Sequence, residues 1–159
     1  MRIIGCILIF LWISILGFQR KWKLEQKCTQ WKTMGLFLQL MREELKSTMK
    51  STEQLILSAQ KRCCDLELLH YYDEAEGTAQ QRLFYAAEKL ADPPMRELSF
   101  RLAQRLGTSP ADIQLESLHS MELQCQQEWE HHRETAGKEG SLAVSMSLLC
   151  GAAVAIILL

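Results

Sequence analysis

The chain has 159 residues, 48% of them hydrophobic, and its 18 Lys and Arg nearly balance its 19 Asp and Glu. This near-neutral charge excludes the strongly basic surface that nucleic-acid binding requires, so we expect no nucleic-acid partner. Between two apolar ends lies a polar middle, residues 19–141, which is long enough for one compact domain and too short for two.

The apolar ends are the runs Ile3 to Phe18 and Leu142 to Leu159, and neither contains a charged side chain. A helix of about 16 to 18 residues reaches roughly 24 to 27 Å, slightly less than a hydrocarbon core of about 30 Å. We therefore expect both runs to be transmembrane helices. The first run could instead be a secretory signal, but no small-residue cleavage site of the A-x-A kind follows it, which favours a retained anchor.

The basic residues predict the orientation of the chain in a membrane. Those that follow the first run are Arg20, Lys21, Lys23, Lys27 and Lys32, and only Arg2 precedes it. Because basic flanks stay in the cytoplasm, the middle should be cytoplasmic and both ends should face away from it. The predicted organisation is a transmembrane helix over 1–18, a cytoplasmic helical bundle over 19–141 and a transmembrane helix over 142–159. Trp22 stands where an interfacial aromatic anchor is expected, and an ordinary tryptophan on the helix surface is the alternative.

The middle begins with a helix that continues from the first run to about Lys50. Leu24, Trp31, Leu38 and Leu45 recur every seven residues, the spacing of a packed helical stripe. The apolar surface is widened by Leu36, Phe37, Leu40 and Met41, which indicates burial against more than one neighbour.

Four further helices are predicted. One starts near Ser51 and carries a single stripe formed by Leu55, Ile56, Ala59, Leu66 and Leu69. After a polar break at 73–78 the next contains Leu83, Phe84, Ala87 and Leu90, and Asp92-Pro93-Pro94 ends it. The helix after that carries Met95, Leu98, Leu102 and Leu106 and ends at Gly107.

The last helix of the middle should begin at Ser109-Pro110, with Ser109 as the capping residue and Pro110 in the first helical position. Its stripe is formed by Leu115, Leu118, Met121, Cys125 and Trp129, and it should reach about Arg133 before Gly137 and Gly140 loosen it. The fold class is therefore all-α, an antiparallel helical bundle flanked by transmembrane helices.

Six cysteines lie at positions 6, 28, 63, 64, 125 and 150. A cytoplasmic domain is kept reduced, so we expect no disulfides, and Cys63-Cys64 lacks the C-x-x-C spacing of a zinc site. Buried or half-buried thiols are the prediction.

Three E-x-x-H motifs start at Glu67, Glu116 and Glu128, and di-iron bundles use two such motifs with two further glutamates. Glu44, Glu67 with His70, Glu88, and Glu116 with His119 would formally supply that set. On a helical wheel, however, Glu116 lies to the side of the apolar stripe and His119 only touches its margin. We therefore expect solvated side chains, no metal and no cofactor. We give the same interpretation to His131-His132 with its neighbouring glutamates.

Small residues recur every four positions along the second apolar run, at Ala143, Ser147, Gly151 and Ala155. This spacing lets two membrane helices approach closely. The predicted seam could join the chain's own first span or another subunit.

The chain resembles the stage III sporulation protein AB family of endospore-forming bacteria. That family is itself similar to the F-type platform protein of type II secretion systems. The resemblance rests on Ile3-Ile4-Gly5 with Gly17-Phe18, on Leu40 to Leu45, on Leu106-Gly107 followed by Asp112, Gln114 and Leu118, and on the end Ala155 to Leu159. Their order and spacing match the family over nearly the whole chain.

The resemblance implies a non-catalytic scaffold of the channel apparatus between mother cell and forespore, anchored in the mother-cell membrane around the forespore. It also implies as partners the ATPase stage III sporulation protein AA and the other stage III A and stage II Q channel proteins, and it leaves homo-oligomers open. A generic membrane-anchored adaptor and a di-iron membrane enzyme are the alternatives. As candidate partner contacts we single out exposed charges of the middle helices: Arg42, Glu43, Arg101 and Arg105.

Overall fold

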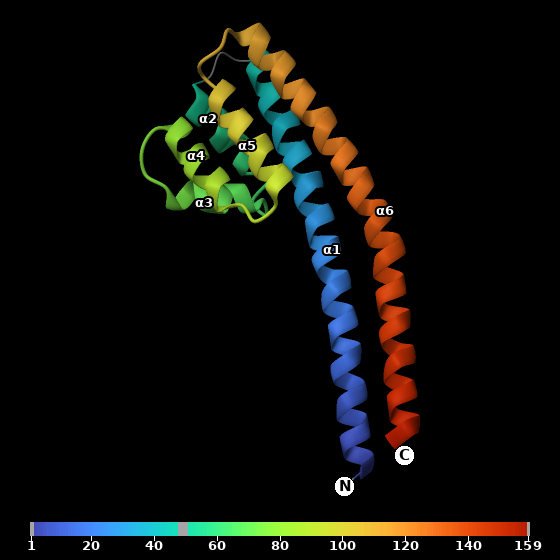
Figure 1. The fold of residues 1–159 in the computed structure, drawn as a ribbon. Helices are drawn as coiled ribbons and strands as arrows, with labels where there is room; N and C mark the ends of the chain where they lie inside the picture. The colour runs from blue at the N-terminus through green and yellow to red at the C-terminus, as the bar shows by residue number, and fades with distance from the viewer. Residues whose placement is uncertain (1, 48–50, 159) are drawn as a thin grey trace. The chain divides into compact units, whose positions relative to one another are not determined.

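A computed structural model describes residues 2–47 and 51–158, with the side chains of residues 12, 15–47, 51–150, 152 and 153. The chain forms six helices (Figure 1): α1 Arg2–Ser47, α2 Thr52–Gln60, α3 Glu67–Glu74, α4 Ala79–Lys89, α5 Pro93–Arg105 and α6 Ala111–Leu158. No strand occurs in these two ranges, and the all-α prediction is confirmed.

The chain divides into two units. The first, the helix-pair unit, consists of the α1 residues up to Thr29 and the α6 residues from Trp129 onward. The second, the bundle unit, covers Gln30–Glu128 and contains the four short helices with the adjoining parts of α1 and α6. We describe each unit by itself.

The core of the bundle unit is apolar and closely packed. From α1 it takes Trp31, Met34, Phe37, Leu38 and Met41, all nearly inaccessible to solvent. Leu36, predicted to widen the same apolar surface, is instead 44% exposed, because the wider surface is covered only on the side of Phe37 and Met41. The heptad spacing therefore identified the packed stripe of α1. The wider apolar surface that includes Leu36 is only partly buried.

The predicted second helix is in fact two helices, which makes six helices where we predicted five. Backbone bonds of the tight i to i+3 kind run from Cys63 N to Gln60 O and from Leu66 N to Cys63 O, both 3.1 Å long, and they turn the chain between α2 and α3. Gln30 of α1 fixes this turn, since its Nε2 donates to Asp65 O at 2.9 Å and its Oε1 accepts from Glu67 N at 3.0 Å. The apolar stripe stays buried because the turn keeps Leu66 facing the core.

A capping box begins α4. The Thr78 hydroxyl accepts from Gln81 N, and the Gln81 side chain accepts from Thr78 N. From the first turn of α4, Arg82 reaches back to α3, donates to Tyr72 O at 3.0 Å and stacks over the Tyr72 ring at 4.0 Å. α4 also packs on α5, where the rings of Phe84 and Phe100 lie 6.0 Å apart.

Pro93 and Pro94 follow the end of α4 and occupy the first two positions of α5. A missing backbone N–H costs nothing there, because the first N–H groups of a helix have no partner within the helix. Asp92 stands before them at the N-cap but does not cap the helix with its side chain. Its Oδ2 accepts instead from the indole Nε1 of buried Trp31 at 3.2 Å, which ties the start of α5 to α1.

Gly107 ends the turn after α5 with φ of +77°, a conformation that suits glycine, as the sequence predicted. α6 then begins at Ala111, one residue later than expected, and Ser109 contributes its carbonyl to Gln114 Nε2. The prediction that Gly137 and Gly140 loosen this helix is wrong. α6 continues without a break to Leu158, because an isolated glycine inside a long helix costs only about 1 kcal/mol.

Candidate functional site

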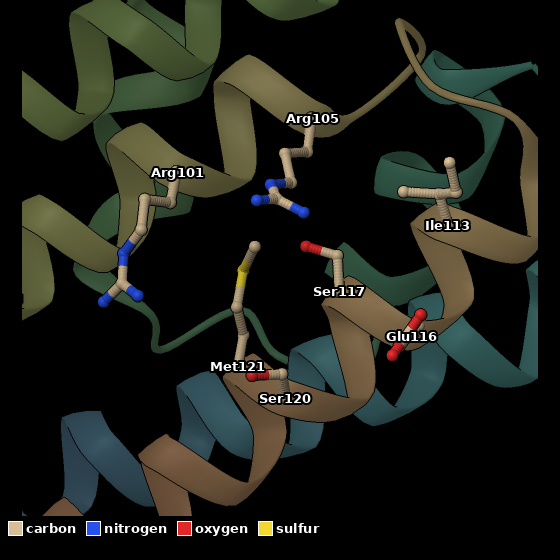
Figure 2. Close-up of a pocket in the computed structure, with 7 residues that line it drawn as sticks. All are labelled: Arg101, Arg105, Ile113, Glu116, Ser117, Ser120 and Met121. Carbon is tan, nitrogen blue, oxygen red and sulfur yellow. The ribbon is translucent and has the colours of Figure 1, made fainter.

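A groove of about 310 Å³ lies between α5 and α6 in the bundle unit (Figure 2). Its lining consists of Arg101 and Arg105 from α5 and of Ile113, Glu116, Ser117, Ser120 and Met121 from α6. The arginines are four residues apart and therefore share one face of α5. The groove thus has a basic wall from α5 and a wall from α6 that combines hydroxyl and apolar side chains with one acid, Glu116.

The two arginines differ in how they are held. Arg101 donates to Gln124 Oε1 at 2.8 Å, and its Nε lies 4.0 Å from Glu97 Oε1, so its position is fixed from two sides. The side chain of Arg105 is exposed and makes no hydrogen bond or ion pair with any residue in the described part of the chain, whereas its carbonyl oxygen accepts from Thr108. Figure 2 shows its guanidinium directed into the groove, toward the Ser117 hydroxyl.

Two apolar side chains, Ile113 and Met121, also line the groove. A second, much smaller hollow adjoins it and shares Arg105, Ser117 and Met121 with it. Leu102, Leu106 and Leu118 line the rest of that hollow together with Gln114, and all three leucines are nearly inaccessible to solvent. A side chain entering the groove would therefore meet positive charge at the rim and hydrocarbon at the base.

The sequence pointed to Arg101 and Arg105 by their charge, but not to the serines opposite them. Ser117 and Ser120 have the i, i+3 spacing that places them on one side of α6. The leucine stripe of the same helix dominates its pattern, so no periodic signal marked them. Only the proximity of α5 makes these hydroxyls part of a site.

The other two predicted partner residues lie elsewhere. The Nε of Arg42 is 3.0 Å from Glu122 Oε2, and both side chains are half-buried, so this arginine forms an ion pair between α1 and α6 inside the bundle unit. His119 Nδ1 stands 3.8 Å from the same carboxylate oxygen. Glu43 is exposed, and its carboxylate accepts from Gln39 Nε2 of its own helix at 3.0 Å. The structure therefore does not bring the four predicted residues into one surface.

The small-residue seam lies within the helix-pair unit. A Cβ at Gly17 of α1 would stand 2.8 Å from the Ser147 Cβ and 3.2 Å from the Ala143 carbonyl oxygen. Farther along, a Cβ at Gly140 would come within 3.2 Å of the Lys21 Cγ. Ala143 and Ser147 thus face the chain's own α1, whereas the side chains of Gly151 and Ala155 lie outside the described residues.

Large apolar side chains remain exposed on both helices of this unit. From α1 they are Trp12, Ile15, Leu16, Phe18 and Trp22, and from α6 they are Leu142, Met146, Leu148 and Leu149. We call this set the apolar belt. Such a concentration is unusual on a surface that faces water alone.

The two predicted transmembrane runs, 3–18 and 142–159, are helical as far as residues 3–18 and 142–158 are described. Across the described residues, no helix meets the length and apolarity needed to cross a membrane. The side chains of residues 3–11, 13, 14, 151 and 154–159 lie outside the described set.

The E-x-x-H motifs do not converge in the structure. His70 is 73% exposed beside Glu74, and Glu116 and His119 are exposed on α6. Among the residues that the structure describes, no group of three or more His, Cys, Asp or Glu side chains could hold a metal ion.

The thiols divide into two groups. Cys63 and Cys125 are buried and Cys28 is half-buried, whereas Cys64 and Cys150 are exposed, so the prediction of buried or half-buried thiols is wrong for these last two. Cys6 lies outside the described side chains. Burial, with smaller contributions from Glu122 and Glu128, raises the pKa of Cys125 to about 12. Burial and then neighbouring Cys64 also raise the pKa of Cys63.

Comparisons with curated proteins and with solved structures gave no match. A comparison with family models gave one whose description is stage III sporulation protein AB, and it covers residues 2–159. The match includes both arginines of the groove, the small-residue seam and the apolar belt. By this match over the whole described length, the chain belongs to the stage III sporulation protein AB family and has a role in stage III of sporulation.

Proposed function

We propose that this chain is a non-catalytic, membrane-anchored scaffold of the channel apparatus that connects mother cell and forespore during sporulation. In this role the helix-pair unit is anchored in the mother-cell membrane around the forespore. The bundle unit lies in the cytoplasm and couples the membrane complex to the ATPase stage III sporulation protein AA. The family supports the sporulation role, and the membrane and partner assignments are the proposal.

The observation that carries the proposal is the apolar belt. The belt lies on both helices of the helix-pair unit, within or beside the uncharged apolar runs 3–18 and 142–159. Basic residues follow at once on the α1 side, beginning with Arg20 and Lys21. A hydrocarbon layer would cover the belt, and the basic residues would remain at its cytoplasmic surface. Trp22, 73% exposed, has the position of an interfacial anchor.

Membrane attachment is tested by placing one charge in the belt. Trp12→Asp and Leu149→Asp, which lie inside the two apolar runs, should be extracted from membranes by a carbonate wash, since aspartate in hydrocarbon costs about 2.5–3.5 kcal/mol near the centre of a helix. Leu57→Asp is the matched control, because Leu57 is 53% exposed on α2, outside the belt. Equal retention of all three variants in the membrane would contradict the assignment of the belt.

The coupling role is tested in sporulating cells that carry a tagged full-length chain in place of the native one. We expect stage III sporulation protein AA and other channel proteins to co-purify with it after detergent extraction. A membrane-bound chain that retains neither would support a generic adaptor instead. Stoichiometric iron in the purified chain, lost with Glu116→Ala, would support the di-iron alternative.

A further inference from the structure

We infer that the groove between α5 and α6 receives an acidic segment of a partner protein, in which a carboxylate stands beside an apolar side chain. Arg105 would pair with the carboxylate, Arg101 would stand beside it, and the apolar side chain would rest on Met121. This inference rests on the proposed function, because the partner offered to the groove is the sporulation ATPase.

The first support is charge without a counterpart. Arg105 points into the groove and has no ion pair with any described residue, although Glu116 lines the same groove. Arg101, four residues away, is already oriented by Gln124 at 2.8 Å, so its ordering cost on binding is reduced. Two guanidinium groups on one helix face can hold a carboxylate through paired N–H bonds.

The second support is the composition of the opposite wall. The Ser117 hydroxyl, toward which Arg105 is directed, can donate to the same carboxylate, and Ser117 is almost fully buried, so little water competes there. Ser120 adds a second hydroxyl to the lining. Met121 and Ile113 add hydrocarbon to the lining of the same groove. An anion with no apolar part would leave these two side chains uncovered.

The third support is size and the absence of other recognition chemistry. The volume of about 310 Å³ lies at the lower end of the usual range for ligand pockets, about 300–1,000 Å³, and suits a few side chains better than a large cofactor. None of the seven lining residues is aromatic, so no ring is available to stack on a nucleotide base. The groove therefore fits an amphipathic acidic segment, as grooves between helices commonly do.

The test measures binding of purified stage III sporulation protein AA to the full chain in lipid nanodiscs. Arg105→Glu should weaken binding by at least about tenfold, and so should Ser120→Trp, which fills the groove without changing its charge. Arg62→Glu is the control, because it makes the same charge change at an exposed arginine outside the groove. Unchanged helical content and melting temperature would show that all three variants fold.

The outcomes separate the inference from the proposed function. If the wild type binds the ATPase and Arg105→Glu or Ser120→Trp binds equally well, the groove is not the contact and the inference fails, while the coupling role survives. If neither the wild type nor Arg62→Glu binds, the coupling role fails and takes the inference with it. Equal weakening by Arg62→Glu would indicate general electrostatic attraction and would also overturn the inference.

A photo-crosslink identifies the occupant directly. Benzoylphenylalanine in place of Ile113, a 46% exposed apolar residue of the lining, should capture an ATPase peptide that contains Asp or Glu next to an apolar residue. Capture of a second copy of this chain, of a lipid or of a basic peptide would contradict the stated chemistry.

Discussion

The indole Nε1 of Trp31 donates to the Asp92 carboxylate at 3.2 Å, across 61 positions of sequence. This bond joins the buried stripe of α1 to the first residue before α5, so the proline-started helix is fixed to the core at its beginning. Asp92 therefore acts as a tertiary contact at a place where sequence alone indicates a helix cap.

Removing this acceptor should destabilise the bundle unit. Asp92→Ala leaves the indole N–H of Trp31 without its Asp92 acceptor, and we expect a loss of about 1–3 kcal/mol in the free energy of unfolding. Chemical unfolding of the full chain in detergent, followed by far-UV circular dichroism, measures it. In a double-mutant cycle with Trp31→Phe, the two losses should be less than additive. Strict additivity would mean that the bond contributes nothing.

The ion pair of Arg42 and Glu122 predicts that Arg42 and its neighbour Glu43 differ in their contribution to stability. Arg42→Ala should lower the free energy of unfolding by about 1–3 kcal/mol, because it leaves a half-buried carboxylate without its nearest cation. Glu43→Ala, at the next position but exposed, should change stability by less than about 0.5 kcal/mol. The same unfolding measurement applies, and similar losses for the two variants would contradict the internal role of Arg42.

The close approach at Gly17 predicts that one methyl group is enough to disturb the helix-pair unit. Gly17→Ala would place a Cβ 2.8 Å from the Ser147 Cβ, so the helices must separate or tilt, and the melting temperature of the full chain should fall. Adding Ser147→Gly should restore part of the loss.

Gly137→Ala is the matched control for this substitution. Gly137 also lies within a long helix, but a Cβ there would meet nothing within 4 Å. Replacement of a helical glycine by alanine should then stabilise by about 0.5–1 kcal/mol. A fall of similar size at both positions would show that the contact with Ser147 is unimportant.

The raised pKa of Cys125 predicts a dependence of stability on alkaline pH. Its ordinary pKa is 9.0 and its pKa in the folded chain is about 12, so between these values the folded state binds more protons than the unfolded state. Stability from this group is complete below about pH 9 and falls as pH rises toward 12. Cys125→Ala should flatten this part of the stability profile, whereas Cys64→Ala, at an exposed thiol, should not.

Thiol labelling checks the same arrangement at neutral pH. Cys64 should react with an alkylating reagent in the folded chain, while adjacent Cys63 and distant Cys125 should react only after unfolding, because they are buried and their thiolate forms are disfavoured. Rapid labelling of Cys125 in the native state would contradict its burial.

Local patterns predicted much of this fold. The heptad stripe marked Trp31 and Leu38 as buried, and Gly107 was correctly expected to end its helix. These features depend on the periodicity of one helix or on the backbone freedom of one residue, both of which are visible along the chain.

What depends on distant residues could not be predicted in this way. The stripe from Leu55 to Leu69 suits one helix as well as two, and the break is fixed by Gln30, more than 30 positions earlier. Likewise, the charge of Arg42 indicated a surface residue, because its pairing with Glu122 arises only when α1 and α6 meet. The groove could not be predicted for the same reason, since its serines face the arginines only because α5 packs on α6.

The side chain of Gln30 has one more consequence, for how the bundle unit is connected to the long helix that enters it. Its amide holds both Asp65 O and Glu67 N, so the first turn of α3 depends on the axial position of α1. A displacement of α1 by one helical turn, about 5.4 Å, would take the amide out of reach of both atoms. A fragment that lacks α1 would lose both bonds, so the first turn of α3 depends on a residue of α1.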